Sequence, residues 1–441
     1  MMRRKISSIT FYSFIFLLSL LCSSICASAQ SGTWSGNLEV QGMKLPLVFH
    51  LNEEGASVDS PDQGVKGIPA EMSLDASGQL TVRISSLNAE YKGILKGDTI
   101  EGVFTQNGFS FPLNLTKGEN KRNRPQTPIP PFPYTEEEVT FRNGDAVLKG
   151  TLTLPKDYTR QTPVLIMVTG SGLQNRDEEI FEHKPFAVLA DAMARARIAS
   201  LRYDDRGFGE STGDVNHMTT ADLKNDALAG IEWLRKRFDN VGVLGHSEGG
   251  TIALMLAAEK KADFIVSLAA MVLPGSETLL WQNREIFSKT GIPKEVVDSY
   301  CQLLADTFEA MEKGTAMPSV DNYNLTAALK QNYMGVLRQL QLPYLQYFLS
   351  LDMRPLLSKV TVPVLALNGT KDTQVDYKGN LDALRAGLPM NKATQIKALE
   401  GLNHLFQHCS TGDTSEYVEI EETIAPEVLQ DVVDFVLTIR K

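Results

Sequence analysis

The stretch that decides the fold is VGVLGHSEGGTIALMLAAEK, residues 241–260. It opens with a short apolar run typical of a buried strand and closes with a longer apolar run of helical spacing. Between the two, GHSEG at 245–249 fits the pattern G-x-S-x-G, which requires a strand before it and a helix after it. Because glycine leaves room for a tight and strained turn, the pattern predicts that Ser247 lies on a sharp strand-to-helix turn at the start of the helix.

Strand-like and helix-like segments alternate on both sides of this turn. Continuous apolar runs that end in glycine or polar residues are typical of strands buried on both faces. The strand-like segments are 163–172, 198–207, 264–270, 360–372 and 394–404, and the helix-like segments are 186–197, 220–238, 381–388 and 426–441. A hairpin-like segment at 137–155 precedes them. This alternation predicts an α/β fold with a mostly parallel sheet covered by helices on both sides.

Residues from about 275 to 359 interrupt the alternation with mixed, mostly helical patterns. A helical insertion of this length between two strands predicts a cap over the site.

The N-terminal part has a different period. In KLPLVFHL, residues 44–51, and FSFPLNL, residues 109–115, apolar side chains alternate with others, as in half-buried strands. Turn signals separate such segments at short intervals. Residues 31–118 are therefore predicted to form a small antiparallel β barrel or sandwich. The proline-rich segment 119–134 is predicted to be a linker to the domain at 135–441.

Residues 1–29 have the features of a cleaved export signal. Basic residues precede the apolar run 11–21, and small Ala27 and Ala29 follow it in the arrangement that a signal peptidase needs. The run is shorter than the roughly 20 apolar residues that span a bilayer, which argues against a membrane anchor. We therefore predict an exported protein, periplasmic or secreted, with no transmembrane span after cleavage.

Charge and cysteine content limit the partners. The 441 residues carry a formal net charge of −10, and removal of three basic residues with the signal makes it −13. Such an acidic chain is not expected to hold nucleic acid. Bulky residues precede Cys22 and Cys26 where lipidation expects a small one. After cleavage, Cys301 and Cys409 could form at most one disulfide.

A serine hydroxyl needs a base to become a good nucleophile. Among six histidines, His404 is the best candidate, because it follows an apolar strand in loop-like sequence, EGLNHLF. The side chain of His246, beside the nucleophile, is expected to point elsewhere. The remaining four are expected at the surface: His50, His183, His217 and His408. No nearby Asp or Glu completes a metal site with His404 and His408, so no metal is expected.

The base needs a carboxylate to hold its tautomer. Asp372 comes first after the strand end in PVLALNGTKDTQV and is preferred, although Asp376 could substitute. The chain order Ser247, Asp372, His404 is expected when three loops meet at one end of a parallel sheet.

An oxyanion needs backbone donors. The Glu248 N–H at the helix start is one. The glycine-rich end of VTGSG makes the Ser171 N–H the second, with Gly172 as the fallback.

With these residues in place, residues 135–441 resemble the α/β-hydrolase superfamily, in its branch of serine esterases and serine peptidases. Thr169 stands where the family's oxyanion loop usually has histidine. RYDDRGFGES resembles the loop after the fourth strand, where Asp205 and Arg206 are expected to form an internal ion pair. Together with the export signal and the β domain, the chain resembles bacterial exported hydrolases of this superfamily.

The resemblance implies acyl transfer to water through Ser247, Asp372 and His404, without metal or organic cofactor. A small ester, or a short acyl or peptide compound, is the expected substrate, and an esterase the expected enzyme. An exopeptidase on the same scaffold is the alternative, favoured if a buried acidic group lies beneath the cap. Glu277 and Glu285 are candidates for that acid, although surface positions are expected for both. A non-catalytic envelope protein that binds a ligand is a third reading, against which the complete triad argues.

Overall fold

The computed structural model describes residues 31–40, 43–52, 55–63, 65–75, 77–118 and 121–439. The predicted export signal at 1–29 lies outside these residues. The chain divides into two compact units. The first runs to Asn123 and includes 180–182, and the second comprises Arg124–Glu179 and His183–Lys441.

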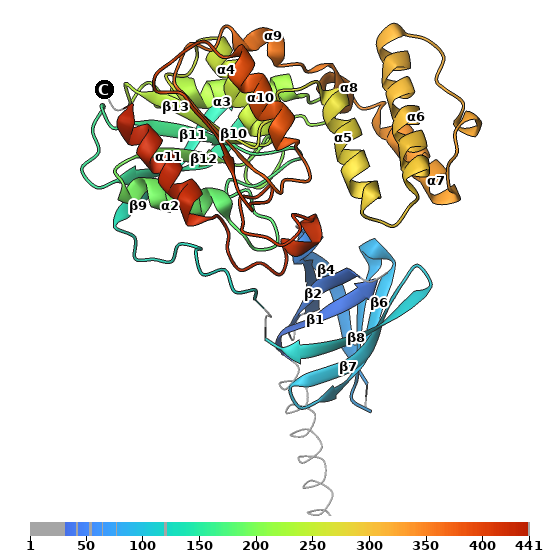
Figure 1. Ribbon diagram of the computed structural model, residues 1–441. Coiled ribbons are helices and arrows are strands. Elements are labelled where there is room, and N and C mark those ends of the chain that lie inside the picture. The colour runs from blue at the N-terminus through green and yellow to red at the C-terminus, as the bar shows by residue number, and fades with distance from the viewer. Residues whose placement is uncertain are drawn as a thin grey trace, which may run out of the picture. The chain divides into compact units, whose positions relative to one another are not determined.

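The first unit contains a closed barrel of eight strands in which all neighbours are antiparallel (Figure 1). The strands are β1 (Gly32–Val40), β2 (Met43–Asn52), β3 (Gly55–Ser60), β4 (Val65–Leu74), β5 (Gln79–Ile84), β6 (Ala89–Lys96), β7 (Thr99–Gln106) and β8 (Phe109–Lys117). Closure of β1 on β8 leaves no free sheet edge. Of the two architectures predicted from the alternating pattern, the structure therefore shows the barrel and not the sandwich.

Alternate residues of these strands fill the barrel. Trp34, Phe49 and Tyr91 are fully buried in its core, and the Tyr91 hydroxyl donates to the carbonyl of Ile100 at 3.0 Å. Phe109 was expected on the buried face of its strand, but it begins β8 beside a turn and is 71% exposed.

The second unit is built on a mostly parallel sheet of eight strands in the order β16-β15-β14-β13-β11-β12-β10-β9. The strands are β9 (Tyr134–Asn143), β10 (Ala146–Pro155), β11 (Val164–Val168), β12 (Ala199–Tyr203), β13 (Val241–His246), β14 (Ile265–Leu268), β15 (Val364–Gly369) and β16 (Gln395–Leu399). Only the hairpin β9–β10 and the pair β10–β12 are antiparallel among these strands. The predicted α/β-hydrolase fold is thereby confirmed.

Helices cover both faces of this sheet (Figure 1). They are α2 (Pro185–Arg195), α3 (Thr220–Leu234), α4 (Glu248–Ala258), α9 (Arg354–Leu357), α10 (Tyr377–Gly387) and α11 (Pro426–Thr438). Val164 and Ile166 of β11 belong to the apolar cluster that includes residues of α3, α4 and α10, whereas Leu165 and Met167 belong to the cluster that includes residues of α2 and α11. This two-sided burial explains why the strand is apolar without alternation.

The predicted cap lies between β14 and β15 and is helical. Its helices are α5 (Gly275–Ser288), α6 (Lys294–Lys313), α7 (Ala327–Gln339) and α8 (Pro343–Ser350). Tyr300, Leu303 and Tyr333 are the centre of a separate apolar cluster that these helices share. The insertion therefore has its own core.

The two cysteines that remain after the predicted cleavage are free thiols. Cys301 is buried in α6, and the Cys409 thiol donates to the carbonyl of Gly401 at 3.4 Å. The single disulfide that the cysteine count allowed is not formed.

Among the described helices, none combines the length and the apolar character needed to cross a membrane.

Candidate active site

Ser247 occupies the predicted sharp turn between β13 and α4. Its φ of 53° and ψ of −117° lie in a region that residues with a side chain rarely adopt. The flanking glycines are required by close backbone approach. A Cβ on Gly245 would lie 1.9 Å from the Gly249 carbonyl oxygen, and a Cβ on Gly249 would lie 2.0 Å from that of Val168. The turn therefore presents Ser247 at the end of the strand, as the N-cap residue of α4.

Asp372 and His404 form a buried pair. The Nδ1 of His404 lies 2.7 Å from Oδ2 of Asp372, which follows β15. The other oxygen, Oδ1, accepts from the N–H groups of Gln374 and Val375 at 2.8 and 2.9 Å. These two bonds fix the carboxylate, and the carboxylate in turn orients the imidazole.

Asp376, the other candidate acid, has a different role. It is the N-cap of α10, where its carboxylate accepts from the N–H groups of Lys378 and Gly379. The structure thus brings His404 to Asp372 and not to Asp376.

The loop that carries His404 follows β16 and is held by its own side chains. Asn403 Oδ1 accepts from the N–H groups of Leu405 and Gln407 at 3.0 and 2.9 Å. The N–H of Lys371 donates to the carbonyl of Leu402 at 2.9 Å, which joins this base loop to the loop of Asp372. The two loops therefore form one connected support.

His404 lies beside the nucleophile turn through its contact with His246. The centroids of the two rings are 4.7 Å apart, and Nε2 of His246 lies 2.9 Å from the His404 carbonyl oxygen. Between the described residues Ser247 and His404 there is no direct hydrogen bond. The structure therefore brings His404 into contact with the residue that precedes Ser247.

The loop after β11 lies against Ser247, the candidate nucleophile. A Cβ on Gly170 would lie 3.3 Å from Cβ of Ser247. The Gly170 N–H donates to Oε1 of Glu178 at 2.8 Å, so it is already occupied. Ser171, the predicted donor, is exposed, and the fallback Gly172 has a φ of 91°. We name residues 169–172 the oxyanion loop.

Asp205 supports the oxyanion loop through Thr169, the first residue of that loop. The Thr169 hydroxyl lies 3.0 Å from both oxygens of Asp205, and the Gln174 N–H donates to Oδ2 of Asp205 at 2.8 Å. Burial raises the pKa of Asp205 to about 8, although both of these hydrogen bonds oppose the rise.

The predicted ion pair of Asp205 with Arg206 is wrong. The Arg206 guanidinium instead forms two bonds of 2.7 Å with the buried carboxylate of Asp226 in α3. The Asp205 carboxyl group instead accepts from the buried Thr169 hydroxyl and from the Gln174 N–H, just after the oxyanion loop.

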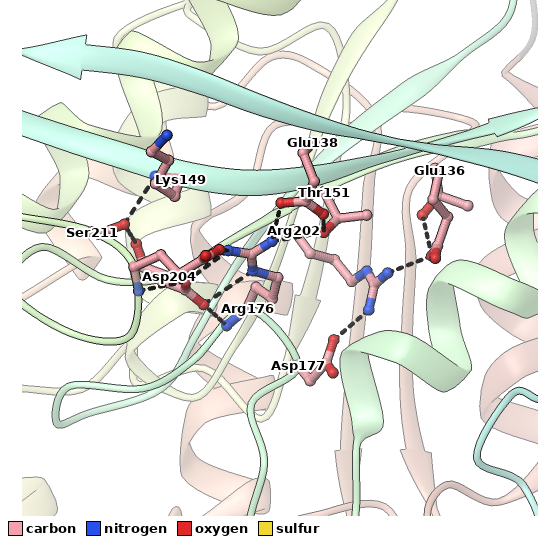
Figure 2. A network of polar contacts seen from close by, with 11 residues as sticks. Glu136, Glu138, Lys149, Thr151, Arg176, Asp177, Arg202, Asp204 and Ser211 are labelled. Carbon is pink, nitrogen blue, oxygen red and sulfur yellow. Dashed lines mark hydrogen bonds and ion pairs between the residues drawn. The ribbon is translucent and has the colours of Figure 1, made fainter.

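A polar network fixes the segment that follows the oxyanion loop (Figure 2). Arg176 bonds Asp204 at 2.8 Å and Glu138 at 2.6 Å, and Arg202 bonds Asp177 and, at 2.7 Å, Glu136. The network ties this segment to strands β9 and β12. Because Arg176 and Asp177 are held in this way, the network also fixes the backbone at Glu178, the next residue along the chain.

Glu178 pairs with His246 in the interior. Its Oε1 lies 3.0 Å from Nδ1 of His246, and the side chains are buried, with residue exposures of 3% and 7%. Burial lowers the pKa of His246, but the charge and hydrogen bond of Glu178, the hydrogen bond to the His404 carbonyl and the charge of Asp372 together raise it above the ordinary value. The histidine was correctly expected to point away from the nucleophile, whereas nothing in the sequence pattern indicated Glu178.

Glu248 and Tyr344 connect the nucleophile helix to the cap. The Glu248 side chain is fully buried, and its Oε2 accepts from the hydroxyl of Tyr344 in α8. Its Oε1 has no hydrogen-bond partner among the described residues. Burial and Glu248 raise the pKa of Tyr344, while a hydrogen bond with the Ser171 side chain lowers it. The motif contained Glu248, but no local signal could have identified Tyr344.

The other four histidines form contacts of their own. His183 was expected at the surface, but it is 1% exposed and lies 2.9 Å from the Thr423 hydroxyl and 3.0 Å from the Tyr417 carbonyl. That expectation failed because both ring nitrogens find buried partners from distant sequence. His408 pairs with Glu422 at 2.9 Å, His50 pairs with Asp59, and His217 is exposed.

A family model described as X-Pro dipeptidyl-peptidase (S15 family) matches residues 143–405, more than half of the chain. The chain is 28% identical over 279 residues to Esterase EstD of Thermotoga maritima, a match that covers 63% of this chain and 61% of the esterase. The matched region thus spans about three fifths of that relative.

Two solved structures show similarity at lower identity. An esterase of Pyrococcus furiosus, PF2001, is 14% identical with a TM-score of 0.45, covering 74% of this chain and 100% of that one. Est1E from Butyrivibrio proteoclasticus is 16% identical with a TM-score of 0.42, covering 68% and 98%.

Proposed function

Because the chain belongs to the X-Pro dipeptidyl-peptidase (S15) family and is a hydrolase on an α/β-hydrolase scaffold, we propose that it cleaves carboxylic esters with Ser247 as nucleophile, His404 as base and Asp372 as acid. The observation that carries the proposal is the buried contact of 2.7 Å between Asp372 and His404, beside a strained turn that presents Ser247.

The proposed reaction begins when the Ser247 hydroxyl attacks the carbonyl carbon and His404 Nε2 takes its proton. Asp372 keeps the hydrogen on Nδ1 and stabilises the imidazolium. His404 then protonates the leaving alcohol, an acyl-enzyme remains on Ser247, and water repeats the sequence to release the acid. Catalytic hydrogen bonds often tighten only in the complex with substrate, so the contact of Ser247 with His404 belongs to that complex.

Two backbone N–H groups are the proposed oxyanion donors. Glu248 is the first residue of α4, whose leading N–H groups have no partner within the helix. Glu178 already accepts from the N–H of Gly170, so the second donor falls to Ser171, the next residue. Both groups would act on the negative oxygen that develops as the carbonyl is attacked.

A panel of p-nitrophenyl esters of varied acyl length tests the proposal. The Ser247→Ala variant is expected to lose about 10³-fold or more in kcat/KM, because members of a triad act as a unit. Turnover unchanged by this substitution would count decisively against the mechanism and would favour a non-catalytic binding role.

The second candidate function is an exopeptidase, and Glu248 is the observation that favours it. A buried carboxylate oxygen without a partner is unfavourable, and the ammonium group of a peptide substrate would supply one. Glu277 is exposed and Glu285 is half-buried, so the buried acid beneath the cap is Glu248 rather than either of them.

Aminoacyl p-nitroanilides compared with matched esters distinguish the two candidates. If an ammonium binds Glu248, Glu248→Gln is expected to lower kcat/KM for the anilides roughly 10-fold to 100-fold and to leave uncharged esters unchanged. Glu277→Gln, in the cap but exposed, is the matched control. Equal effects of Glu248→Gln on both substrate classes would rule out this use of the carboxylate.

A further inference from the structure

We propose that Glu178 and His246 are positioning residues that hold the base loop, the nucleophile turn and the oxyanion loop in one fixed arrangement. The inference rests on the proposed function, because it concerns the geometry of the same reaction. Neither residue touches the reacting atoms in this scheme. Both act through neighbours that do.

The hydrogen-bond partners determine how His246 is protonated. Its Nε2 lies 2.9 Å from the carbonyl oxygen of His404, which can only accept, so Nε2 carries a hydrogen. Its Nδ1 lies 3.0 Å from Oε1 of Glu178, an oxygen that also accepts from the Gly170 N–H. Because each ring nitrogen faces its own acceptor oxygen, His246 is an imidazolium that donates two hydrogen bonds.

One oxygen atom joins two of the catalytic loops. Oε1 of Glu178 receives the Gly170 N–H at 2.8 Å and His246 Nδ1 at 3.0 Å. The far side of the same imidazolium holds the backbone of His404. A displacement of any one of these groups therefore displaces the other two.

Each group that the pair holds is within one residue of a reacting group. Gly170 precedes the proposed donor Ser171, and His246 precedes Ser247. The third group held is the carbonyl of the base itself. Because a misplacement of about 1 Å in such a site can cost 100-fold in rate, the pair is placed where small shifts matter most.

The charged and titratable neighbours of His246 come from three loops. Glu178 lies after the oxyanion loop. The charge of Asp372, in the loop after β15, also acts on His246. The centroid of the His404 ring, in the base loop, lies 4.7 Å from that of His246. Phe406 closes the remaining side at a centroid distance of 6.3 Å. The pair is thus enclosed, and solvent does not replace either partner.

Two variants test the proposal with a short p-nitrophenyl ester, after active-site titration with a serine-reactive fluorophosphonate. Glu178→Gln keeps the shape of the side chain and an acceptor oxygen, and it removes the charge. His246→Gln keeps an N–H that can reach the His404 carbonyl. Each variant is expected to lower kcat roughly 10-fold to 100-fold with KM changed by less than about twofold.

The matched control is the pair of His408 and Glu422, whose side chains are 57% and 25% exposed and which lies in the same part of the chain. His408→Asn and Glu422→Gln remove a histidine–carboxylate contact of 2.9 Å without touching the site. They are expected to leave kcat and KM unchanged.

The dependence of kcat on pH gives a readout that a merely structural role would not move. In the wild-type protein, kcat is expected to fall at alkaline pH as His246 loses its proton and one of its two bonds. In the His246→Gln variant this alkaline fall is expected to disappear, because the amide does not titrate.

Several outcomes would overturn the proposal. These are a kcat of Glu178→Gln within about twofold of wild type at full active-site titre, an equal loss in the control pair, or an unchanged alkaline limb in His246→Gln. If neither variant gives folded protein, the pair is a folding element and the proposal is wrong. Failure of the proposed function is separate, because Ser247→Ala would then match the wild-type protein.

Discussion

Two buried pairs of a histidine with a carboxylate lie next to each other in the second unit, and they differ at the second ring nitrogen. His404 contacts Asp372 through Nδ1 at 2.7 Å, and its Nε2 makes no hydrogen bond to another described residue. His246 contacts Glu178 through Nδ1 at 3.0 Å, and its Nε2 is held by the His404 carbonyl at 2.9 Å. Of these two histidines, only His404 has a ring nitrogen left to accept a proton, which supports the proposal that His404 rather than His246 is the base.

The carboxylates differ in a corresponding way. Asp372 accepts two N–H groups of its own loop, so it is fixed locally and serves one imidazole. Glu178 shares a single oxygen between two other segments of the chain. The first arrangement orients one side chain, and the second ties separate loops together.

The largest expected effect comes from removing the charge of the first pair. Asp372→Asn is expected to lower kcat roughly 10⁴-fold, because asparagine can hold the imidazole in the wrong tautomer. The measurement is ester hydrolysis at saturating substrate. Asp376→Asn is the control, since asparagine caps a helix about as well as aspartate. A larger loss in the control than in Asp372→Asn would show that the acid had been assigned to the wrong residue.

The next largest effect is expected at the turn between β13 and α4, where the side chains of His246 and Ser247 point in different directions. Gly245→Ala is expected to lower the free energy of unfolding by about 3 kcal/mol or more, because its Cβ would meet the Gly249 carbonyl, which is backbone and cannot move aside.

Gly335→Ala in α7 is the matched control. No atom lies within 4 Å of its added Cβ, so alanine should stabilise the helix by up to about 1 kcal/mol. Denaturant unfolding of both variants gives the comparison. A Gly245→Ala protein as stable as wild type would mean that the turn can relax and does not fix the two side chains.

Sequence alone predicted one of these two pairs and not the other. Ser247, Asp372 and His404 each follow a strand and lie within a recognisable local pattern, so the shared edge of a parallel sheet is enough to expect them together. Glu178 has no such pattern. It lies ten residues after Val168, the end of β11, and its position depends on the bonds of Arg176 and Asp177 to other strands.

Contacts between distant segments also explain the other failures. No sequence pattern around His183 indicates burial, and the residue is buried because Thr423 and Tyr417, more than 200 residues away, contact its two ring nitrogens. Arg206 was assigned to its neighbour Asp205, although α3 supplied a buried carboxylate, Asp226, in better geometry. Periodicity indicates which face of an element is buried, but it does not indicate which polar group will meet another.

Asp205 is another buried carboxyl group, and among the described residues no histidine or arginine pairs with it. Burial raises its pKa to about 8 from an unfolded value near 3.9. Between these values the folded protein keeps a proton that the unfolded chain releases. The contribution of protonated Asp205 to the free energy of unfolding is therefore complete below about pH 4 and is lost as pH rises to about 8.

The Asp205→Asn variant lacks this titration. The free energy of unfolding of the wild-type protein falls from about pH 5 to pH 7, so that of the variant, measured relative to wild type, is expected to rise by about 2 kcal/mol over this range. Urea unfolding at both pH values measures the difference. A constant difference would mean that the carboxyl group is ionised throughout, as an ion-paired group would be.

The smallest expected effect comes from a histidine–carboxylate contact that lacks burial. The His408 side chain is 57% exposed, and it meets Glu422 at 2.9 Å and Glu427 at 3.2 Å. Exposed pairs contribute about 0–1 kcal/mol, so His408→Asn is expected to change the free energy of unfolding by less than about 0.5 kcal/mol and to leave kcat unaltered. Since His408 lies four residues after His404, the comparison separates burial from position in the loop. A tenfold fall in kcat would mean that a change at the exposed end of the base loop alters the position of His404. The pair of Glu178 and His246 would then not be enough to fix the base loop.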